Sequence, residues 1–128
     1  MTRDLLHTGA RVDQARVTCV FLHGRGQSPE AMVDHVVRHL PLDGVAWLLP
    51  CAPGGSWYAA RAVDPLTEAT RAELSAALHG VRDVIARTRS QTARPLVLAG
   101  FSQGACLSLE HAFTGQDPAD AVLAFTGC

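Results

Sequence analysis

What this 128-residue sequence has little of narrows its function before any motif is considered. Aromatic residues make up 5% and charged residues 18% of the chain, and 11 basic against 12 acidic residues leave a formal net charge of −1. Without a basic surplus, nothing indicates binding to nucleic acid or to an anionic membrane surface. Apolar runs such as residues 45–49 are far too short to span a membrane. Residues 1–7 include an acid and a histidine where a secretion signal needs an apolar stretch. We therefore expect a cytoplasmic protein with no membrane span.

The four cysteines are scattered, and no two of them form a Cys-x-x-Cys pair. Without such spacing, neither a zinc site nor a redox pair is expected. Three of them lie in or beside apolar runs, where a free cysteine packs as a small hydrophobic residue. We expect all four to be reduced, as in a reducing cytoplasm. The four are Cys19, Cys51, Cys106 and Cys128.

What the sequence does have is enough apolar material, 48% of its residues, for the core of a single domain over residues 1–128. Four short, continuous apolar runs favour the strands of a parallel sheet, and the continuity of the first run suggests burial on both faces. These runs are residues 17–22, 45–49, 96–99 and 121–125.

Segments with helical spacing of apolar residues separate the expected strands. Residues 28–30, Ser-Pro-Glu, have the N-cap, the proline and the acid of a helix start, and the spacing continues to Leu40. A long helix is expected from about residue 64 or 67, and another over residues 102–114 with Gly115 as its C-cap. Strands that alternate with helical crossovers of this length predict an α/β fold.

The most informative motif is Gly-Phe-Ser-Gln-Gly at residues 100–104. An expected strand runs directly into it and an expected helix leaves it, which is the context of a nucleophile elbow. A tight turn of this kind strains the backbone at the serine, and glycines two residues to either side avoid collisions. The motif predicts Ser102 as the nucleophile and the Gln103 N–H as an oxyanion donor. The alternative is that Ser102 is a helix N-cap after a glycine-rich turn.

A second motif, His-Gly-Arg-Gly at residues 23–26, follows the first expected strand. Its glycines let the backbone approach a substrate carbonyl, and the Arg25 N–H would be the second oxyanion donor. Taken alone, this motif is explained better by a glycine-rich turn. Next to the Ser102 motif it predicts the other half of an oxyanion hole.

At these residues the sequence resembles a known family. The stretches Val20–Gly26, Trp57-Tyr58 and Leu98–Cys106 are similar to the phospholipase/carboxylesterase group of α/β-hydrolases. That group includes the acyl-protein thioesterases and small bacterial carboxylesterases. The Phe before and the Gln after the serine are typical of this group rather than of hydrolases at large. Ala121–Gly127 also resembles the strand that follows the elbow helix, so the resemblance extends over about residues 16–128.

The resemblance implies an incomplete, three-layer α/β-hydrolase-type parallel sheet, with about four central strands and flanking helices. The implied strand order is 45–49, 17–22, 96–99, 121–125. It also implies a serine esterase without cofactor or metal, which forms an acyl-enzyme with small carboxylic esters or thioesters. The residues that it places on substrate-binding loops are His23, Gly24, Trp57 and Tyr58. For the two aromatic residues, expected near the acyl pocket, an ordinary partly buried pair is an equal alternative.

The sequence departs from the family at the catalytic acid and base, which follow the serine in this fold. The acids and histidine that remain after Ser102 are Glu110, His111, Asp117 and Asp120. His111 lies roughly 13 Å along the expected helix, pointing away from the nucleophile. Asp117 and Asp120 precede the fourth strand, at the opposite end of the sheet. His23 belongs to the oxyanion loop. The other histidines, expected at the surface on helices or tails, are His7, His35, His39 and His79.

The leading interpretation is therefore a truncated serine esterase or thioesterase that lacks the triad Asp and His and is nearly inactive alone. The alternative is a non-catalytic binding or interaction domain on the same half-fold. The coding sequence after Cys128 would distinguish the two. A flavodoxin-like or nucleotide-binding sheet is disfavoured because no loop has a Walker lysine or a Gly-x-Gly-x-x-Gly motif. The open edge at residues 121–125 is expected to favour self-association.

Overall fold

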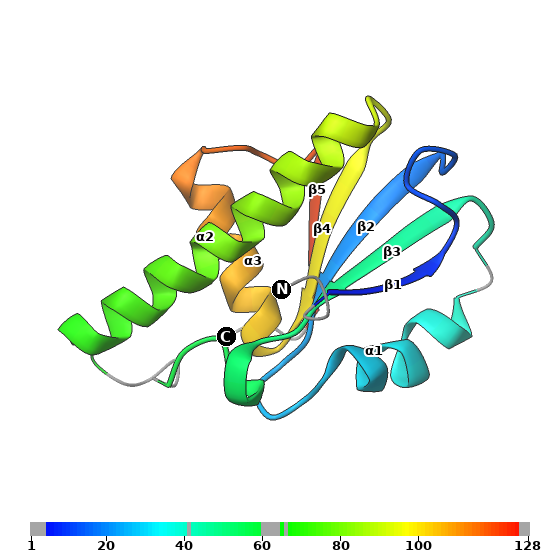
Figure 1. Cartoon of the computed structure of the whole chain (residues 1–128). Coiled ribbons are helices and arrows are strands. Elements are labelled where there is room, and N and C mark those ends of the chain that lie inside the picture. Colours follow the sequence, from blue (N-terminus) through cyan, green and yellow to red (C-terminus); the bar gives the residue numbers. More distant parts are fainter. Residues whose placement is uncertain (1–4, 41, 60–64, 66, 126–128) are drawn as a thin grey trace.

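The computed structural model describes residues 5–40, 42–59, 65 and 67–125, and its centre is a five-stranded sheet (Figure 1). The strand order is β1-β3-β2-β4-β5. The strands are β1 (Leu5–Gly9), β2 (Val17–Leu22), β3 (Val45–Pro50), β4 (Leu96–Phe101) and β5 (Ala121–Phe125). Strands β2 to β5 pair in parallel. The four expected strands and their order are therefore confirmed.

Strand β1 was not expected, and it makes the sheet mixed rather than purely parallel. It runs antiparallel to β3, with Leu5 opposite Pro50 and Gly9 opposite Ala46. His7 lies in this strand, not on a helix or a tail. A five-residue edge strand that is only half-buried has too short a pattern to identify it, because its conformation is decided by pairing with a distant strand.

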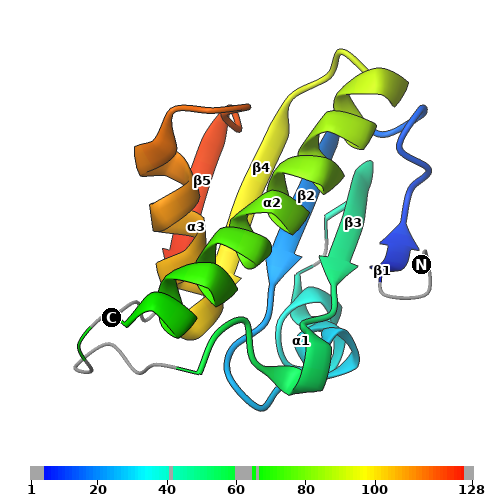
Figure 2. The same ribbon diagram turned by 60° about the vertical axis from the view of Figure 1, so that its left-hand side comes forward.

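Helices cover both faces of the sheet (Figure 2). They are α1 (Pro29–His35), α2 (Glu68–Gln91) and α3 (Gln103–Thr114), with short 3₁₀ turns η2 (Val37–His39) and η3 (Pro53–Gly55). The expected starts and ends are largely confirmed: Ser28 caps α1, Thr67 caps α2 and Gly115 ends α3 with φ 68°. The first helix is shorter than expected, because it changes to η2 before Leu40. None of the helices in the described ranges is long and apolar enough to cross a membrane.

Two apolar layers separate the sheet from its helices, and alternate residues of β2 belong to different layers. Val20 and Leu22 pack with residues of α2 and α3. Cys19 and Phe21 pack with residues of α1. This alternation confirms that the central strands are buried on both faces, as their continuous apolar runs predicted.

The cysteines differ from the sequence-based expectation. Cys19 is a buried free thiol, and its burial raises its pKa to about 12. Cys51 is exposed and is not disulfide-bonded. Cys106, in contrast, is disulfide-bonded, so the expectation that all the cysteines are reduced is wrong for this residue. Cys128 lies outside the described residues. Scattered cysteines cannot be paired from sequence, because pairing depends on contacts that form only in the fold.

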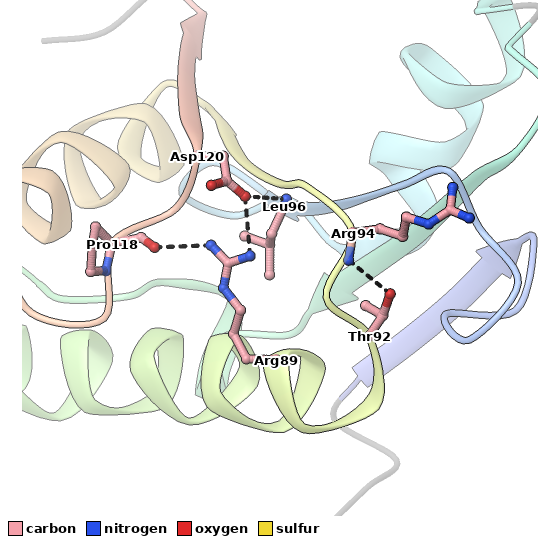
Figure 3. A network of polar contacts seen from close by, with 6 residues as sticks. All are labelled: Arg89, Thr92, Arg94, Leu96, Pro118 and Asp120. Atoms are coloured by element: carbon pink, nitrogen blue, oxygen red, sulfur yellow. Dashed lines mark hydrogen bonds and ion pairs between the residues drawn. The ribbon is translucent and has the colours of Figure 1, made fainter.

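A polar network joins α2, β4 and β5 at the amino ends of the parallel strands (Figure 3). The Asp120 carboxylate accepts hydrogen bonds from the Leu96 N–H at 2.8 Å and from the Arg89 guanidinium at 3.1 Å. Arg89 also donates to the Pro118 carbonyl at 3.2 Å. Leu96 begins β4, whereas Ser102 follows the end of β4. Asp120 is therefore at the end of the sheet opposite Ser102, as expected.

We predict that Asp120→Asn lowers the melting temperature at pH 7. The Leu96 N–H, followed by Arg89, lowers the pKa of Asp120 below its ordinary value of 3.8. A carboxyl group whose pKa is lowered by folding stabilises the fold above that ordinary value. This stabilisation is lost as the pH falls through the lowered value. In thermal melts, the melting temperatures of the wild type and of Asp120→Asn should therefore differ at pH 7 and converge as the pH falls below about 4.

The control for this prediction is Asp34→Asn, which removes an exposed ion pair between Asp34 of α1 and Arg38 of η2, 2.7 Å apart. Such pairs contribute little to stability. A shift for Asp34→Asn as large as that for Asp120→Asn would contradict a particular contribution of the Asp120 charge to the bonds with Leu96 and Arg89.

Candidate functional site

Ser102 occupies a strained turn between the last residue of β4 and the first residue of α3. Its φ is 56° and its ψ is −115°, a conformation that non-glycine residues rarely adopt. The Ser102 N–H donates to the Phe125 carbonyl at 3.0 Å, and the Ser102 carbonyl accepts from the Cys106 N–H at 3.1 Å. The residue itself is exposed. The expected strained strand-to-helix turn is thus confirmed, and it displays the serine at the surface.

Gly100 and Gly104 are required by close backbone approaches on either side of this turn. A Cβ on Gly100 would overlap the Gly104 carbonyl and lie 2.6 Å from the Ala105 nitrogen. A Cβ on Gly104 would overlap the Leu22 carbonyl and lie 2.7 Å from the His23 oxygen. Real Cβ atoms do not approach backbone so closely, so only glycine fits at both positions. The first turn of α3 therefore packs directly on the end of β2 at Gly104.

The loop after β2 lies directly beside Ser102. A Cβ on Gly24 would be 3.2 Å from the Ser102 Cβ. The Gly24 N–H donates to the Gln27 side chain, and the Gly26 N–H donates to the Gly55 carbonyl, each at 2.8 Å. Arg25 lies between these two anchored amides, and its guanidinium donates to the Ala59 carbonyl at 2.9 Å. The two sequence motifs are therefore brought together in space.

The Gln103 side chain has a role that the sequence did not reveal. Its Oε1 accepts from the Trp57 N–H at 2.9 Å, and its Nε2 donates to the Tyr58 carbonyl at 2.8 Å. The backbone of Trp57 and Tyr58 thus lies beside the first residue of α3, and their expected place near an acyl pocket stays a prediction. The sequence contains one signal for this side-chain role, the glutamine that follows the serine, but the motif predicts a function only for the main-chain N–H of that residue.

The Trp57 side chain is buried rather than open to a substrate at Ser102. Its indole N–H donates to the His23 carbonyl at 2.8 Å, and 9% of the residue is exposed. Trp57 also lines a cavity of about 470 Å³ between the loop after β3 and α2. Neither Ser102 nor Tyr58 lines this cavity.

His23 is a structural residue of the loop. The residue is fully buried, and its ring stacks on Trp57 with centroids 5.0 Å apart. Its Nε2 accepts from the Ala52 N–H at 3.0 Å, so its proton lies on Nδ1 and is donated to the Gly24 carbonyl at 2.7 Å. Desolvation lowers the pKa of His23 and keeps the ring neutral. A substrate-binding role for this side chain does not fit its burial, and neither ring nitrogen is available to Ser102.

The other histidines lie elsewhere. His111 is buried in α3, and its Nε2 is 3.0 Å from the Asp117 carbonyl oxygen. His7, His35, His39 and His79 are exposed, as expected. Among the described residues, no histidine is hydrogen-bonded to Ser102, and no group of His, Cys, Asp and Glu is arranged to hold a metal ion. The described part of the chain thus combines an exposed serine and an adjoining glycine loop, and none of its histidines is hydrogen-bonded to that serine.

Comparisons with known proteins agree with this arrangement. Residues 7–128 match the family described as Phospholipase/Carboxylesterase. A solved phospholipase/carboxylesterase from Dyadobacter fermentans is 33% identical, with a TM-score of 0.86 over 97% of this chain and 59% of that chain. No protein in the curated set matches significantly.

Two further solved structures share the fold. Esterase PE8 is 25% identical, with a TM-score of 0.73 over 95% of this chain and 62% of that chain. Acyl-protein thioesterase 2 from Zea mays is 24% identical, with a TM-score of 0.63 over 84% of this chain and 50% of that chain. The chain therefore spans less than two thirds of the length of each of these proteins.

We predict that Gly104→Ala destabilises the fold by roughly 1–3 kcal/mol, because the added methyl group collides with the end of β2. Gly80→Ala is the matched control. Gly80 lies within α2 with open space around it, so alanine there should stabilise the helix by roughly 0.5–1 kcal/mol. Urea denaturation of both variants measures the difference. Equal effects of the two substitutions would contradict the close contact at Gly104.

Proposed function

The chain belongs to the phospholipase/carboxylesterase family of α/β-hydrolases, and from this premise we propose that Ser102 is the nucleophile of a serine esterase or thioesterase. The observation that carries the proposal is the exposed serine held at φ 56° between a buried strand and a helix. Such a turn aims a hydroxyl out of the sheet at a substrate. Small carboxylic esters or thioesters are the proposed substrates.

In the proposed reaction, the Ser102 Oγ forms a bond to the acyl carbon while a base takes the hydroxyl proton. The carbonyl π electrons move to the oxygen, which becomes the oxyanion. The Arg25 and Gln103 N–H groups are the proposed oxyanion donors. This is supported by the contact of the Arg25 loop with Ser102 and by the position of Gln103 in the first turn of α3, where N–H groups lack helical partners. The intermediate then expels the alcohol or thiol, which takes the proton, and water hydrolyses the acyl-enzyme.

The triad Asp and His are proposed to come from a segment outside these 128 residues. Support comes from the histidines of the described residues, which are buried on backbone partners or exposed away from Ser102. The same observation favours the second candidate, a non-catalytic binding domain on this fold. A cytoplasmic location stays a prediction, and the disulfide at Cys106 removes the cysteine-based argument for it.

We predict that the 128-residue chain hydrolyses short p-nitrophenyl esters poorly and reacts weakly with a fluorophosphonate probe. A serine hydroxyl is a weak nucleophile without an adjacent base, and loss of triad function leaves roughly 10³–10⁴-fold catalysis over water. Adding a downstream family segment that contains Asp and His, fused or in trans, should restore both activities. Ser102→Ala in the completed protein should then abolish them.

The matched control for Ser102→Ala is Ser108→Ala. Ser108 is buried in the same helix and donates to the Gly104 carbonyl at 2.9 Å. This variant should keep the label on Ser102. Strong, Ser102-dependent labelling of the 128-residue chain alone would refute the proposed need for an outside base. A completed protein that never labels would favour the binding domain.

We also propose that the chain self-associates through β5. Leu123 and Phe125 are 49% and 44% exposed, and β5 has only β4 as a described neighbour. The Phe125 ring stacks on the Phe21 ring with centroids 6.2 Å apart. The Leu123 and Phe125 side chains therefore lie on the face of the sheet that α1 covers elsewhere. An open apolar edge strand offers unpaired backbone groups and an apolar surface to a second copy.

We predict that sedimentation velocity detects dimers or larger species of the 128-residue chain. Leu123→Lys should shift them toward monomer, because a charge on an edge strand opposes pairing. Leu42→Lys is the matched control, since Leu42 is 55% exposed but lies outside the sheet. A monodisperse wild-type monomer with an accessible β5 would refute this proposal.

A further inference from the structure

We propose that the Gln103 side chain is a positioning residue, which fastens the Trp57 loop (residues 56–59) and, through it, the loop of residues 23–26 to the nucleophile turn. The relevance of this contact to catalysis rests on the proposed function, but the contact itself can be tested without measuring turnover. It concerns the side-chain amide, whereas the proposed oxyanion donor is the main-chain N–H of the same residue.

Both ends of the Gln103 amide are used on adjacent peptide groups. The oxygen accepts from the Trp57 N–H at 2.9 Å, and the nitrogen donates to the Tyr58 carbonyl at 2.8 Å. The residue is 6% exposed, so water does not readily replace either bond. Glutamine fits this place because it presents one acceptor and one donor side by side. A carboxylate would face the Tyr58 carbonyl with a second acceptor, and an apolar side chain would leave both backbone groups unpaired.

The contact continues from Trp57 to the loop after β2. The Trp57 indole N–H donates to the His23 carbonyl at 2.8 Å, and the indole stacks on the His23 ring. His23 directly precedes the residues that lie beside Ser102. A continuous series of hydrogen bonds therefore runs from the start of α3, through the Trp57 loop, to the peptide group that precedes Gly24.

Two further bonds join the loop of residues 23–26 to residues 52–55, which directly precede the Trp57 loop. The Gly26 N–H donates to the Gly55 carbonyl at 2.8 Å, and the Ala52 N–H donates to the His23 ring at 3.0 Å. The two loops thus form one unit, and Gln103, the residue after the proposed nucleophile, joins that unit to the start of α3. Loss of the amide should loosen the unit relative to Ser102 while the sheet beneath it stays intact.

Hydrogen exchange in the 128-residue chain tests this inference with Gln103→Leu and Gln103→Glu. In Gln103→Leu, the Trp57 backbone N–H should exchange at least about tenfold faster than in the wild type, because its buried acceptor is gone. Amides in the centre of β2 and β4, such as those of Val20 and Leu98, should keep their wild-type rates. Gln116→Glu, on the exposed loop after α3, controls for the added charge of Gln103→Glu.

Gln103→Glu adds a test that a general loss of stability cannot imitate. At pH 7.5 its carboxylate still offers an acceptor to the Trp57 N–H, but its second oxygen is repelled by the Tyr58 carbonyl. This repulsion should loosen the Trp57 loop, so the Trp57 N–H should exchange faster than in the wild type. At pH 5 the carboxyl group, whose pKa is raised by burial and by the facing carbonyl, regains an O–H donor beside an acceptor. Protection relative to the wild type at the same pH should then return, and in Gln103→Leu it should not. The wild type at each pH corrects for titration of His23.

A wild-type exchange rate at Trp57 in Gln103→Leu would overturn the inference, as would equal acceleration of the β2 and β4 amides. Absence of pH-dependent recovery in Gln103→Glu would also overturn it, and this variant decides the matter if Gln103→Leu does not fold. A serine that never reacts with the fluorophosphonate probe refutes the proposed esterase activity and leaves these exchange rates unaffected. The two proposals therefore fail separately.

Discussion

The contact between the first turn of α3 and the end of β2 is the constraint on which the rest of the site depends. Gly104 touches the carbonyls of Leu22 and His23 at a distance that excludes any side chain. Because the helix start and the strand end are joined there, Ser102 comes to lie beside Gly24, and Gln103 comes within reach of the Trp57 loop. A single close approach between two backbones thus brings the loop of residues 23–26 beside Ser102 and the Trp57 loop beside Gln103.

Much of this arrangement could be predicted from the sequence because its causes are local. The central strands β2, β3 and β4 appear as unbroken apolar runs, since both of their faces are buried. The turn at Ser102 is encoded by its two glycines, which lie within five consecutive residues. The helix caps at Ser28 and Gly115 likewise depend on neighbouring residues only. Where a feature depends on residues close in the chain, the pattern indicates it before the fold is known.

The features that could not be predicted depend on contacts between distant segments. Strand β1 is an edge strand, and its conformation follows from antiparallel pairing with β3, some forty residues away in the chain. The Gln103 amide matches the backbone of Trp57 and Tyr58 only after α2 and β4 have brought them together. His23 stands in a motif that suggests chemistry, yet its ring is buried and bonded on both nitrogens. Residue type indicates what a side chain is able to do, and burial decides which of those roles remains open.

The hydrogen bond from the Ser102 N–H to the Phe125 carbonyl has a consequence for the order in which the protein is made. During synthesis, the serine, its two glycines and the first turn of α3 are added to the chain before Phe125, whose carbonyl holds the serine backbone. Until β5 emerges and pairs with β4, the strained peptide at Ser102 lacks this partner, and a relaxed conformation is open to it. The strained backbone at Ser102 is therefore held in part by a strand that follows the motif in the chain.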